Sequence, residues 1–247
     1  MASAVRQVLR QVGGGGAAQH SLRMLMVGCP GSGKGTLSER IVKEFPVEHV
    51  TAGDILRRHI RDGTDIGLEA AKVIRAGRLM PDETMMELIH SELKMLGEKN
   101  WILDGFPRTL GQAELLTATL VAAEHPLSLV VNLVVPEEVI LQRILDRWTH
   151  IPSGRVYNMS FNPPKCPGFD DITGEPLEKR EDDNPETFKK RIAAFHEKTE
   201  PMISLFRSMS CPTDPSRPLV VDLAGSTSNE IWPKLQHVLR ERFPYFT

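Results

Sequence analysis

This sequence has few cysteines, no long apolar runs and no large excess of either charge. The 247 residues include three widely separated cysteines, which favour a reducing compartment over a disulfide framework or a C-x-x-C metal pair. The longest apolar runs, such as residues 127–135, are far shorter than the roughly 20 residues of a membrane-spanning helix. The net charge of −2 leaves no excess of basic residues that could bind a polyanion such as a nucleic acid. The composition therefore argues against a membrane protein and against a nucleic-acid partner.

Acidic residues are missing from the N-terminal segment, where none precedes Glu39. Residues 1–21 instead carry Arg6 and Arg10, and their valines and Leu9 can share the opposite face of a helix. This composition is typical of a mitochondrial targeting segment, although residues 13–16 are all glycine. The alternative is a disordered basic N-terminus that is not a targeting signal.

The rest of the chain has the composition of a globular enzyme, with 40% hydrophobic and 25% charged residues. Short apolar runs alternate with helical patterns, which predicts an α/β fold with a doubly wound, five-stranded parallel sheet. The expected strands lie near residues 24–27, 48–50, 101–104, 127–135 and 219–223. Because no coiled-coil pattern is present, we expect a monomer.

A glycine-rich loop follows the first expected strand, at residues 28–36, and we interpret it as a phosphate-binding loop. Its four glycines remove the Cβ atoms that would keep backbone N–H groups away from phosphate oxygens, and Lys34 adds a positive charge. Leu37, Ile41 and Phe45 then predict a helix whose positive N-terminal end faces the same anion. The alternative is a simple glycine-rich turn between a strand and a helix.

This loop departs from the general phosphate-loop pattern, in which Ser or Thr follows the lysine directly. Here Gly35 takes that place and the hydroxyl comes one residue later, at Thr36. A second informative stretch, residues 101–108, ends an apolar strand in Asp104 and continues as Gly-Phe-Pro-Arg. A carboxylate at the end of a buried strand is where phosphate-loop enzymes hold Mg²⁺, directly or through water, so Asp104 is a candidate for that role. The alternative is a helix cap or turn residue.

Two further regions are organised around these stretches. Between residues 51 and 80 short helical patterns carry apolar residues, Leu68 among them, that we expect in the core. A helix from Glu137 onward is expected to carry Arg143 and Arg147 on one face. Residues 150–183 then change to proline, glycine and acidic residues, which is typical of a loop-and-strand insertion.

Three motifs together make the sequence resemble the adenylate kinase family over residues 22–243. They are G-x-P-G-x-G-K-G-T at 28–36, D-G-F-P-R at 104–108, and the stretch from Arg147 through Ser-Gly-Arg-Val-Tyr at 153–157 to Arg-Glu-Asp-Asp at 180–183. The resemblance implies a P-loop nucleoside monophosphate kinase with a monophosphate-binding insertion at 51–80 and the family's long lid at 146–183.

The resemblance also implies the reaction, which is phosphoryl transfer from a Mg²⁺-bound nucleoside triphosphate to AMP. At matching positions it implies five catalytic residues: Lys34, Arg108, Arg147, Arg180 and Arg191. The triphosphate would be bound by Gly31, Ser32, Gly33, Lys34, Gly35, Thr36, Arg147, Val156 and Tyr157. AMP would be bound by Thr51, Arg57, Arg78, Leu79, Met80, Gly105, Phe106, Pro107, Arg108, Gln112, Arg180 and Arg191, with Gln112 reading the adenine.

Two positions distinguish this chain within the family pattern. Ala52 stands where Ser or Thr usually precedes the Gly-Asp of the first monophosphate helix, so only Thr51 keeps a hydroxyl there. Some bacterial members of the family hold zinc in the lid through three or four cysteines, but the lid of this chain has only Cys166. In place of a zinc site the lid resembles metal-free lids, which have a hydrogen-bonded polar cluster, here of His150, Ser153, Asp170 and Thr173. We therefore predict no structural metal.

The donor is predicted from Arg147-Trp148-Thr149-His150 and residues 229–233, which resemble the mitochondrial-matrix branch that phosphorylates AMP with GTP. We expect GTP or ITP as donor and a location in the mitochondrial matrix. The alternatives are an ATP-dependent adenylate kinase, a phosphate-loop switch NTPase without an acceptor, and a non-catalytic binding protein. Trp148 could also be a packing residue without influence on base choice.

Overall fold

A five-stranded parallel sheet forms the centre of the computed structural model, which describes residues 21–180 and 183–246. Its strand order is β2-β3-β1-β4-β7, with each neighbouring pair parallel. The bounds are β1 Arg23–Gly28, β2 Glu48–Thr51, β3 Trp101–Asp104, β4 Leu129–Val134 and β7 Val220–Ala224. The predicted doubly wound α/β sheet is confirmed. The expected targeting segment, except for its last residue, lies outside the described residues.

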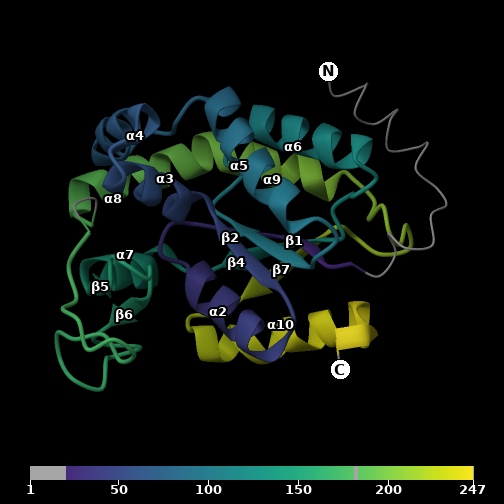
Figure 1. The fold of residues 1–247 in the computed structure, drawn as a ribbon. Coiled ribbons are helices and arrows are strands. Elements are labelled where there is room, and N and C mark those ends of the chain that lie inside the picture. Colours follow the sequence, from purple (N-terminus) through teal and green to yellow (C-terminus); the bar gives the residue numbers. More distant parts are fainter. Residues whose placement is uncertain (1–20, 181–182, 247) are drawn as a thin grey trace.

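Helices cover both faces of the sheet, which explains why its strands are nearly continuous in apolar residues (Figure 1). One face packs against α2 (Lys34–Glu44) and α10 (Ser228–Arg242), and Leu37, Ile41 and Phe45 lie in this core as predicted. The other face packs against α3 (Ala52–Arg61), α5 (Asp82–Leu96), α6 (Leu110–Ala122) and α9 (Glu200–Arg207). A short 3-10 turn, Pro244–Phe246, follows α10. In the part of the chain described, no helix has the length and apolar character needed to cross a membrane.

The region after β2 contains α3 and α4 (Asp65–Arg75), which pack closely against each other. Gly67 makes this contact possible, because a Cβ atom there would lie only 2.1 Å from the carbonyl oxygen of His59. The buried residues of α4 are Gly67 and Ala70. The prediction that Leu68 belongs to the core is wrong, since its side chain is 60% exposed on the other side of the helix.

The region after β4 contains α7 (Glu137–Leu145) and a small antiparallel pair, β5 (Arg147–Thr149) and β6 (Val156–Asn158). The prediction that Arg143 and Arg147 share one helix is wrong, because α7 ends at Leu145 and Arg147 begins β5. The chain returns through α8 (Pro185–Ala194), a π-helical turn η1 (Phe195–Thr199) and α9. These three segments form one long helical stretch from Pro185 to Arg207.

The carboxyl ends of the parallel strands meet at one edge of the sheet. Gly28 ends β1, Thr51 ends β2 and Asp104 ends β3, and in the strand register Asp104 pairs with both Met26 and Thr51. In doubly wound folds ligands bind at this edge. The phosphate loop, Asp104 and the first residue of the 51–80 region are therefore held together by the sheet itself.

Candidate active site

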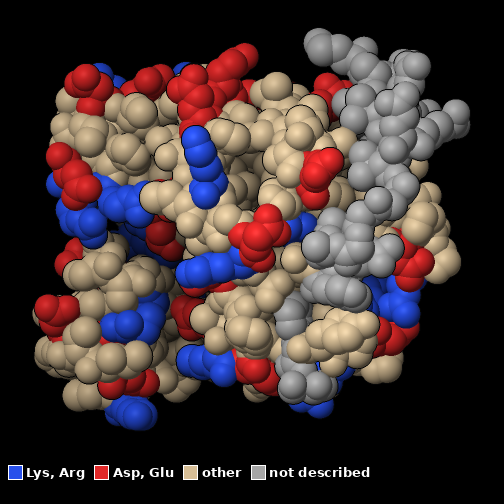
Figure 2. Space-filling view, turned by 45° about the vertical axis from the view of Figure 1, so that its right-hand side comes forward, with Lys and Arg blue, Asp and Glu red and all other residues tan. Residues whose placement is uncertain are grey.

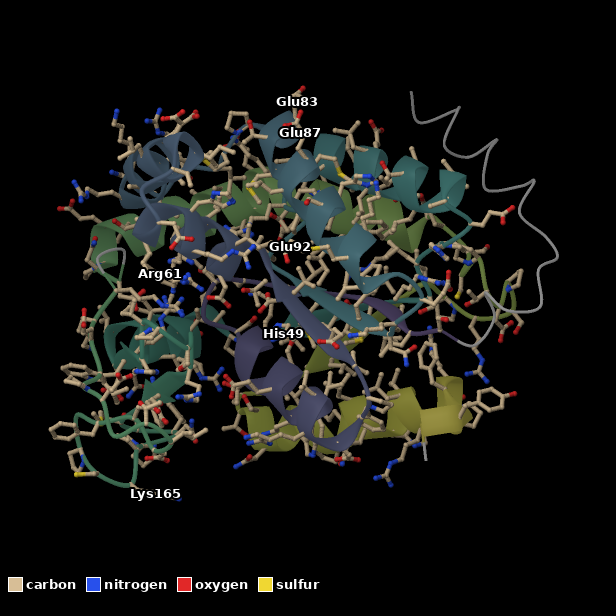
Figure 3. All side chains as sticks on the ribbon, viewed as in Figure 1. His49, Arg61, Glu83, Glu87, Glu92 and Lys165 are labelled. Carbon is tan, nitrogen blue, oxygen red and sulfur yellow. The ribbon has the colours of Figure 1, made fainter. Side chains whose placement is uncertain are left out.

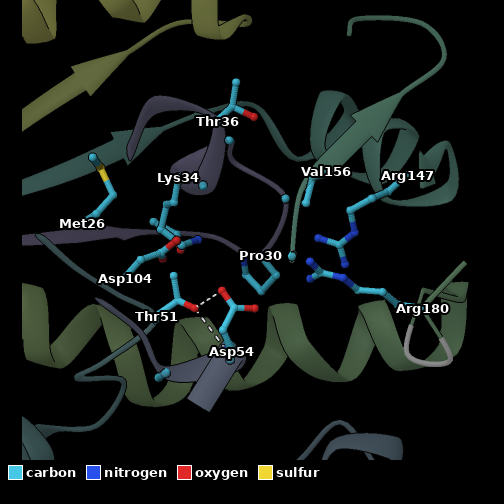
Figure 4. Close-up of a pocket in the computed structure, with 18 of the residues that line it drawn as sticks. Met26, Pro30, Lys34, Thr36, Thr51, Asp54, Asp104, Arg147, Val156 and Arg180 are labelled. Carbon is cyan, nitrogen blue, oxygen red and sulfur yellow. Dashed lines mark hydrogen bonds between the residues drawn. The ribbon is translucent and has the colours of Figure 1, made fainter. Parts of the chain in front are cut away.

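A cavity of about 810 Å³ opens at this edge of the sheet. Its walls come from the phosphate loop, from residues 49–57 and 77–80, from residues 104–108 and from the lid region. Basic side chains gather along the hollow at the left of Figure 2, and Figure 4 shows Lys34, Arg147 and Arg180 around the cavity. The cavity therefore brings together predicted residues that lie up to 160 positions apart, from Gly31 to Arg191.

The phosphate loop has the backbone geometry that its glycines predict. Gly31 and Gly33 have φ angles of 84° and 94°, in the left-handed region that favours glycine. Helix α2 begins directly after Gly33 with no side-chain cap and no acidic residue in its first turn. Its first N–H groups are thus available to an anion in the cavity. The Ser32 side chain is buried and does not line the cavity, and the contact of Ser32 with the triphosphate stays a prediction.

Lys34 is held across the loop by two hydrogen bonds. Its Nζ donates to the carbonyl oxygens of Gly28 and Cys29, at 2.9 and 3.0 Å. Burial lowers the pKa of Lys34, while nearby Asp104 opposes the shift. Burial also raises the pKa of the Cys29 thiol to about 12, which disfavours the thiolate form.

Asp104 lies beside Lys34 in the cavity, with 13% of its side-chain surface exposed (Figure 4). His49, which the sequence analysis missed, also lines the cavity, with Nε2 4.0 Å from Oδ2 of Asp104. One carboxylate facing a phosphate cradle fits the way Mg²⁺ binds with a nucleotide, through one or two carboxylates, waters and phosphate oxygens. Among the described residues, no group of three or more His, Cys, Asp and Glu is arranged to hold a metal ion.

The wall predicted to bind AMP is built around residues 51–57. Thr51 caps α3 by accepting a hydrogen bond from the backbone N–H of Asp54. Arg57 pairs with the carboxylate of Asp54 through Nε, at 3.1 Å, and Nη2. Burial alone would raise the pKa of Asp54, but Arg57 and the Thr51 hydroxyl bring it below its ordinary value. Ala52 lines the cavity with a methyl group only.

The segment after Asp104 forms the adjoining wall. Gly105 has a φ of 78°, and its carbonyl oxygen accepts a 2.7 Å hydrogen bond from Nε of Arg108. Gln112 lines the cavity from the first turn of α6, although its side chain is 2% exposed and its amide already contacts protein groups. The remaining predicted residues of this wall all line the cavity: Arg78, Leu79, Met80, Phe106 and Pro107.

The region predicted to be the lid, residues 146–183, forms another wall of the cavity. Arg147 pairs with Asp183, and Nε of Arg180 donates to Oγ1 of Thr149 at 3.1 Å. Arg147, Arg180, Arg191 and Val156, which the sequence analysis assigned to the site, all line the cavity. A Cβ atom on Gly154 would lie 3.1 Å from Oδ1 of Asp54, so the lid touches the 51–80 region across the cavity.

Tyr157, which the sequence analysis assigned to the triphosphate site, does not line the cavity and belongs to a buried polar cluster inside the lid. Its hydroxyl donates to Oδ1 of Asp170 at 2.9 Å, and Arg155 pairs with the same carboxylate. The predicted cluster is confirmed, since His150 contacts Ser153 and Thr173 contacts Asp170. These bonds hold the pKa of Asp170 well below its usual range, with Arg155 as the largest cause.

Comparison with known proteins agrees with this geometry. The family model described as "Adenylate kinase" matches residues 26–211 of this chain. The chain belongs to the adenylate kinase family. It is therefore a phosphotransferase, as its phosphate loop and arginines predict.

Proteins from two organisms are similar to this chain along most of their length. A protein of Saccharomyces cerevisiae named "GTP:AMP phosphotransferase, mitochondrial" is 44% identical over 90% of this chain and 94% of its own. A protein with the same name in S. cerevisiae strain S288c is 48% identical over 75% of this chain and 85% of its own. The protein with this name in Drosophila melanogaster is 41% identical over 89% and 96% of the two chains.

Trp148 of this adenylate kinase family member lies outside the cavity wall. It pairs with Tyr157 in the β5–β6 register, and the Nζ atom of Lys179 lies 4.9 Å from its ring centre. This position is that of a packing residue with a cation–π partner. The interpretation of Trp148 as a packing residue is therefore the one that the structure favours.

The kinase has a further stretch of cavity wall whose residues the sequence analysis did not predict to lie together. Arg143 lies there, with Nη2 donating to the carbonyl oxygen of Ser226 at 2.5 Å and the guanidinium 5.2 Å from the ring centre of Phe161. Residues 227–229 continue this wall, and Nη2 of Arg40 donates to Oδ1 of Asn229 at 2.6 Å. Sequence separation concealed this group, because its members come from α2, α7, the lid and the start of α10.

Proposed function

We propose that this protein transfers the terminal phosphoryl group of GTP to AMP and forms GDP and ADP. The observation that carries the proposal is the 41–48% identity to three proteins named GTP:AMP phosphotransferase, over most of both chains. The two sets of arginines around one cavity support it. A hydrolase that binds one triphosphate has no use for a second anion site at Arg57 and Arg108.

The donor would bind in the phosphate loop. The backbone N–H groups after Gly31 and the start of α2 would surround its β and γ phosphates, and Lys34 would lie against the same oxygens. The base would lie farther along the cavity, against Arg143 and residues 227–229. These residues, and not Trp148, are the ones placed to distinguish GTP from ATP.

The acceptor would bind between residues 51–57 and 105–112. Arg57 and Arg108 would hold the phosphate of AMP, since each arginine offers parallel N–H donors to a phosphate. In the transfer step an oxygen of that phosphate attacks the γ phosphorus while the bond to the β–γ bridging oxygen breaks. GDP is the leaving group, and ADP is formed.

Mg²⁺ fits the cavity as a cofactor, with Asp104 as the carboxylate that would hold it. When bound, it would neutralise charge on the phosphate oxygens of the donor. Arg147 and Arg180 of the lid lie on the side of the cavity opposite Lys34 (Figure 4), and together with Arg191 of α8 they would stabilise the transferring group. Closure of the lid against Asp54 would exclude water, so the phosphoryl group passes to AMP and is not hydrolysed.

The test is an initial-rate assay in which GTP and ATP are each combined with AMP and with GMP. We expect ADP and GDP from GTP with AMP, dependence on Mg²⁺, and a lower kcat/KM for ATP as donor. A clear preference for ATP would replace the GTP assignment with that of an ATP-dependent adenylate kinase. Hydrolysis that is independent of AMP would overturn the assignment of the second anion site.

The mitochondrial names of the three relatives support a mitochondrial location, and we place the protein in the matrix. The acid-free N-terminus is consistent with this assignment. Protease protection in intact mitochondria and in mitoplasts tests the compartment. Digestion in mitoplasts with an intact inner membrane would contradict the matrix assignment.

A further inference from the structure

Asp82 lies behind the AMP wall, at the first residue of α5, and its carboxylate joins α5 to the first turn of α6. Oδ2 accepts a 2.8 Å hydrogen bond from Oγ1 of Thr109, and Oδ1 accepts one of 2.9 Å from Nε2 of Gln112. Gly111 leaves room for this approach, because a Cβ atom there would lie 2.8 Å from Oδ2 of Asp82. The carboxylate is therefore fixed in place against Gln112.

The amide of Gln112 is held at both ends. Nε2 donates to Asp82, and Oε1 accepts a 2.7 Å hydrogen bond from the backbone N–H of Arg108. If the amide turned over, its oxygen would face the carboxylate of Asp82 and its nitrogen would face the N–H of Arg108, and both hydrogen bonds would be lost. Asp82 and Arg108 thus allow only one orientation of this side chain.

In this orientation Gln112 keeps one N–H donor and one oxygen lone pair, since a carboxamide has two of each. Gln112 is 2% exposed but lines the cavity, so a ligand there is the remaining partner for these groups. Adenine offers an acceptor at N1 and a donor at its 6-amino group. Guanine and hypoxanthine offer the reverse, a donor at N1 and an acceptor at O6. A fixed donor beside a fixed acceptor can therefore accept one class of purine and oppose the other.

We propose that Asp82 determines the acceptor specificity of this enzyme by orienting the amide of Gln112 toward 6-aminopurines and against 6-oxopurines. Asp82 touches no substrate in this proposal and acts as a positioning residue. The proposal rests on the proposed function, in which AMP is the acceptor and Gln112 contacts its base. It adds the residue that prevents the amide from turning over to accept GMP or IMP.

The test compares AMP with IMP as acceptors in wild type and in Asp82→Asn, with GTP as donor. Asparagine has the shape of aspartate but can face Gln112 with either its oxygen or its nitrogen, so only the backbone N–H of Arg108 still favours one orientation of the amide. Because hydrogen bonds to charged groups are the strong ones, we expect the ratio of kcat/KM for AMP to that for IMP to fall by about tenfold or more. The KM for GTP is expected to stay unchanged.

Glu83→Gln is the matched control, because Glu83 is the neighbouring carboxylate in the first turn of α5 and lies exposed at the surface (Figure 3). It removes the same charge from the helix N-terminus without touching Gln112, and we expect the wild-type ratio. Asp82→Ser is a second variant, since serine is well tolerated at the start of a helix. An AMP to IMP ratio within about twofold of wild type in both Asp82 variants would overturn the proposal.

A double variant separates positioning from a general loss of structure. If Asp82 acts through Gln112, Asp82→Asn leaves the ratio of Gln112→Ala unchanged. A further drop of that ratio in the double variant would show that Asp82 acts elsewhere. Failure of the proposed function is distinguishable, because the wild-type protein would then form no ADP from AMP and GTP.

Discussion

Arg147 and Asp183 join the two ends of the lid. Nε of Arg147 donates to Oδ2 of Asp183 at 2.7 Å, and Nη2 contacts the other carboxylate oxygen. The carboxylate of Asp183 is fully buried, while 12% of the Arg147 side chain is exposed. Arg147 lines the cavity, so Asp183 fixes the direction of a guanidinium that we assign to the triphosphate.

Asp183→Asn is therefore expected to lower kcat/KM for the donor by about 10²-fold, because a small displacement of a positioned group has effects of this size. Steady-state rates at varied GTP and saturating AMP measure this change. The control is Glu178→Gln, which removes an exposed carboxylate from the same lid. Equal losses in both variants would show that the charge of the lid matters and the pairing with Arg147 does not.

Lys34→Met is expected to lower kcat by about 10²- to 10³-fold or more, since it removes a positive group placed where negative charge develops. AMP binding, measured by calorimetry, is expected to persist because Lys34 lies outside the 51–57 wall. Lys94→Met in the last turn of α5 removes a lysine distant from the cavity and serves as control. Full activity of Lys34→Met would contradict its assignment.

Two glycines of the phosphate loop are expected to respond in opposite ways to alanine. Gly28 has a φ of 145°, and a Cβ atom there would lie 2.9 Å from the backbone oxygen of Leu133. The strained backbone alone is therefore expected to lower the free energy of unfolding of Gly28→Ala by about 1–3 kcal/mol. A Cβ atom on Gly35 meets nothing within 4 Å, so Gly35→Ala is expected to stabilise by about 0.4–1 kcal/mol. Urea unfolding of both variants measures the contrast, and equal stabilities would refute it.

The Asp170 cluster gives the lid a defined pH dependence. The pKa of Asp170 is depressed in the folded lid, so its contribution to stability is complete above the unfolded value of about 3.9. That contribution is lost as the pH falls below this value and through the lower folded pKa. Hydrogen exchange of residues 147–158 is expected to be faster in Asp170→Asn than in wild type at neutral pH, with the difference vanishing in strong acid.

Asp171→Asn is the control for this lid experiment, because Asp171 is exposed and accepts a hydrogen bond only from the backbone N–H of Lys165 among the bonds described. It is expected to exchange like wild type. If the difference in exchange rate between wild type and Asp170→Asn grew as the pH fell from 4 to 2, the prediction would be wrong.

The fold and the phosphate loop could be predicted because their signals are contiguous in sequence. Apolar runs predicted the strands, and glycine spacing with Lys34 predicted the cradle. Pairings such as Arg147 with Asp183, or Asp82 with Gln112, join residues 36 and 30 positions apart, and no local pattern indicates them. The error at Arg147 has the same origin, because its four-residue spacing from Arg143 suggests a helix while β-pairing with β6 ends that helix.

Trp148 provides the last prediction, which concerns the choice of donor. Its ring lies against Lys179 and outside the cavity, so Trp148→Phe is expected to change the ratio of kcat/KM for GTP to that for ATP by less than about twofold. Arg143→Met alters the cavity wall itself and is expected to raise the KM for GTP. Initial rates with both donors measure these effects. A preference of Trp148→Phe for ATP over GTP would contradict the prediction. Strand β5, which contains Trp148, would then have to be assigned a role in the choice of donor.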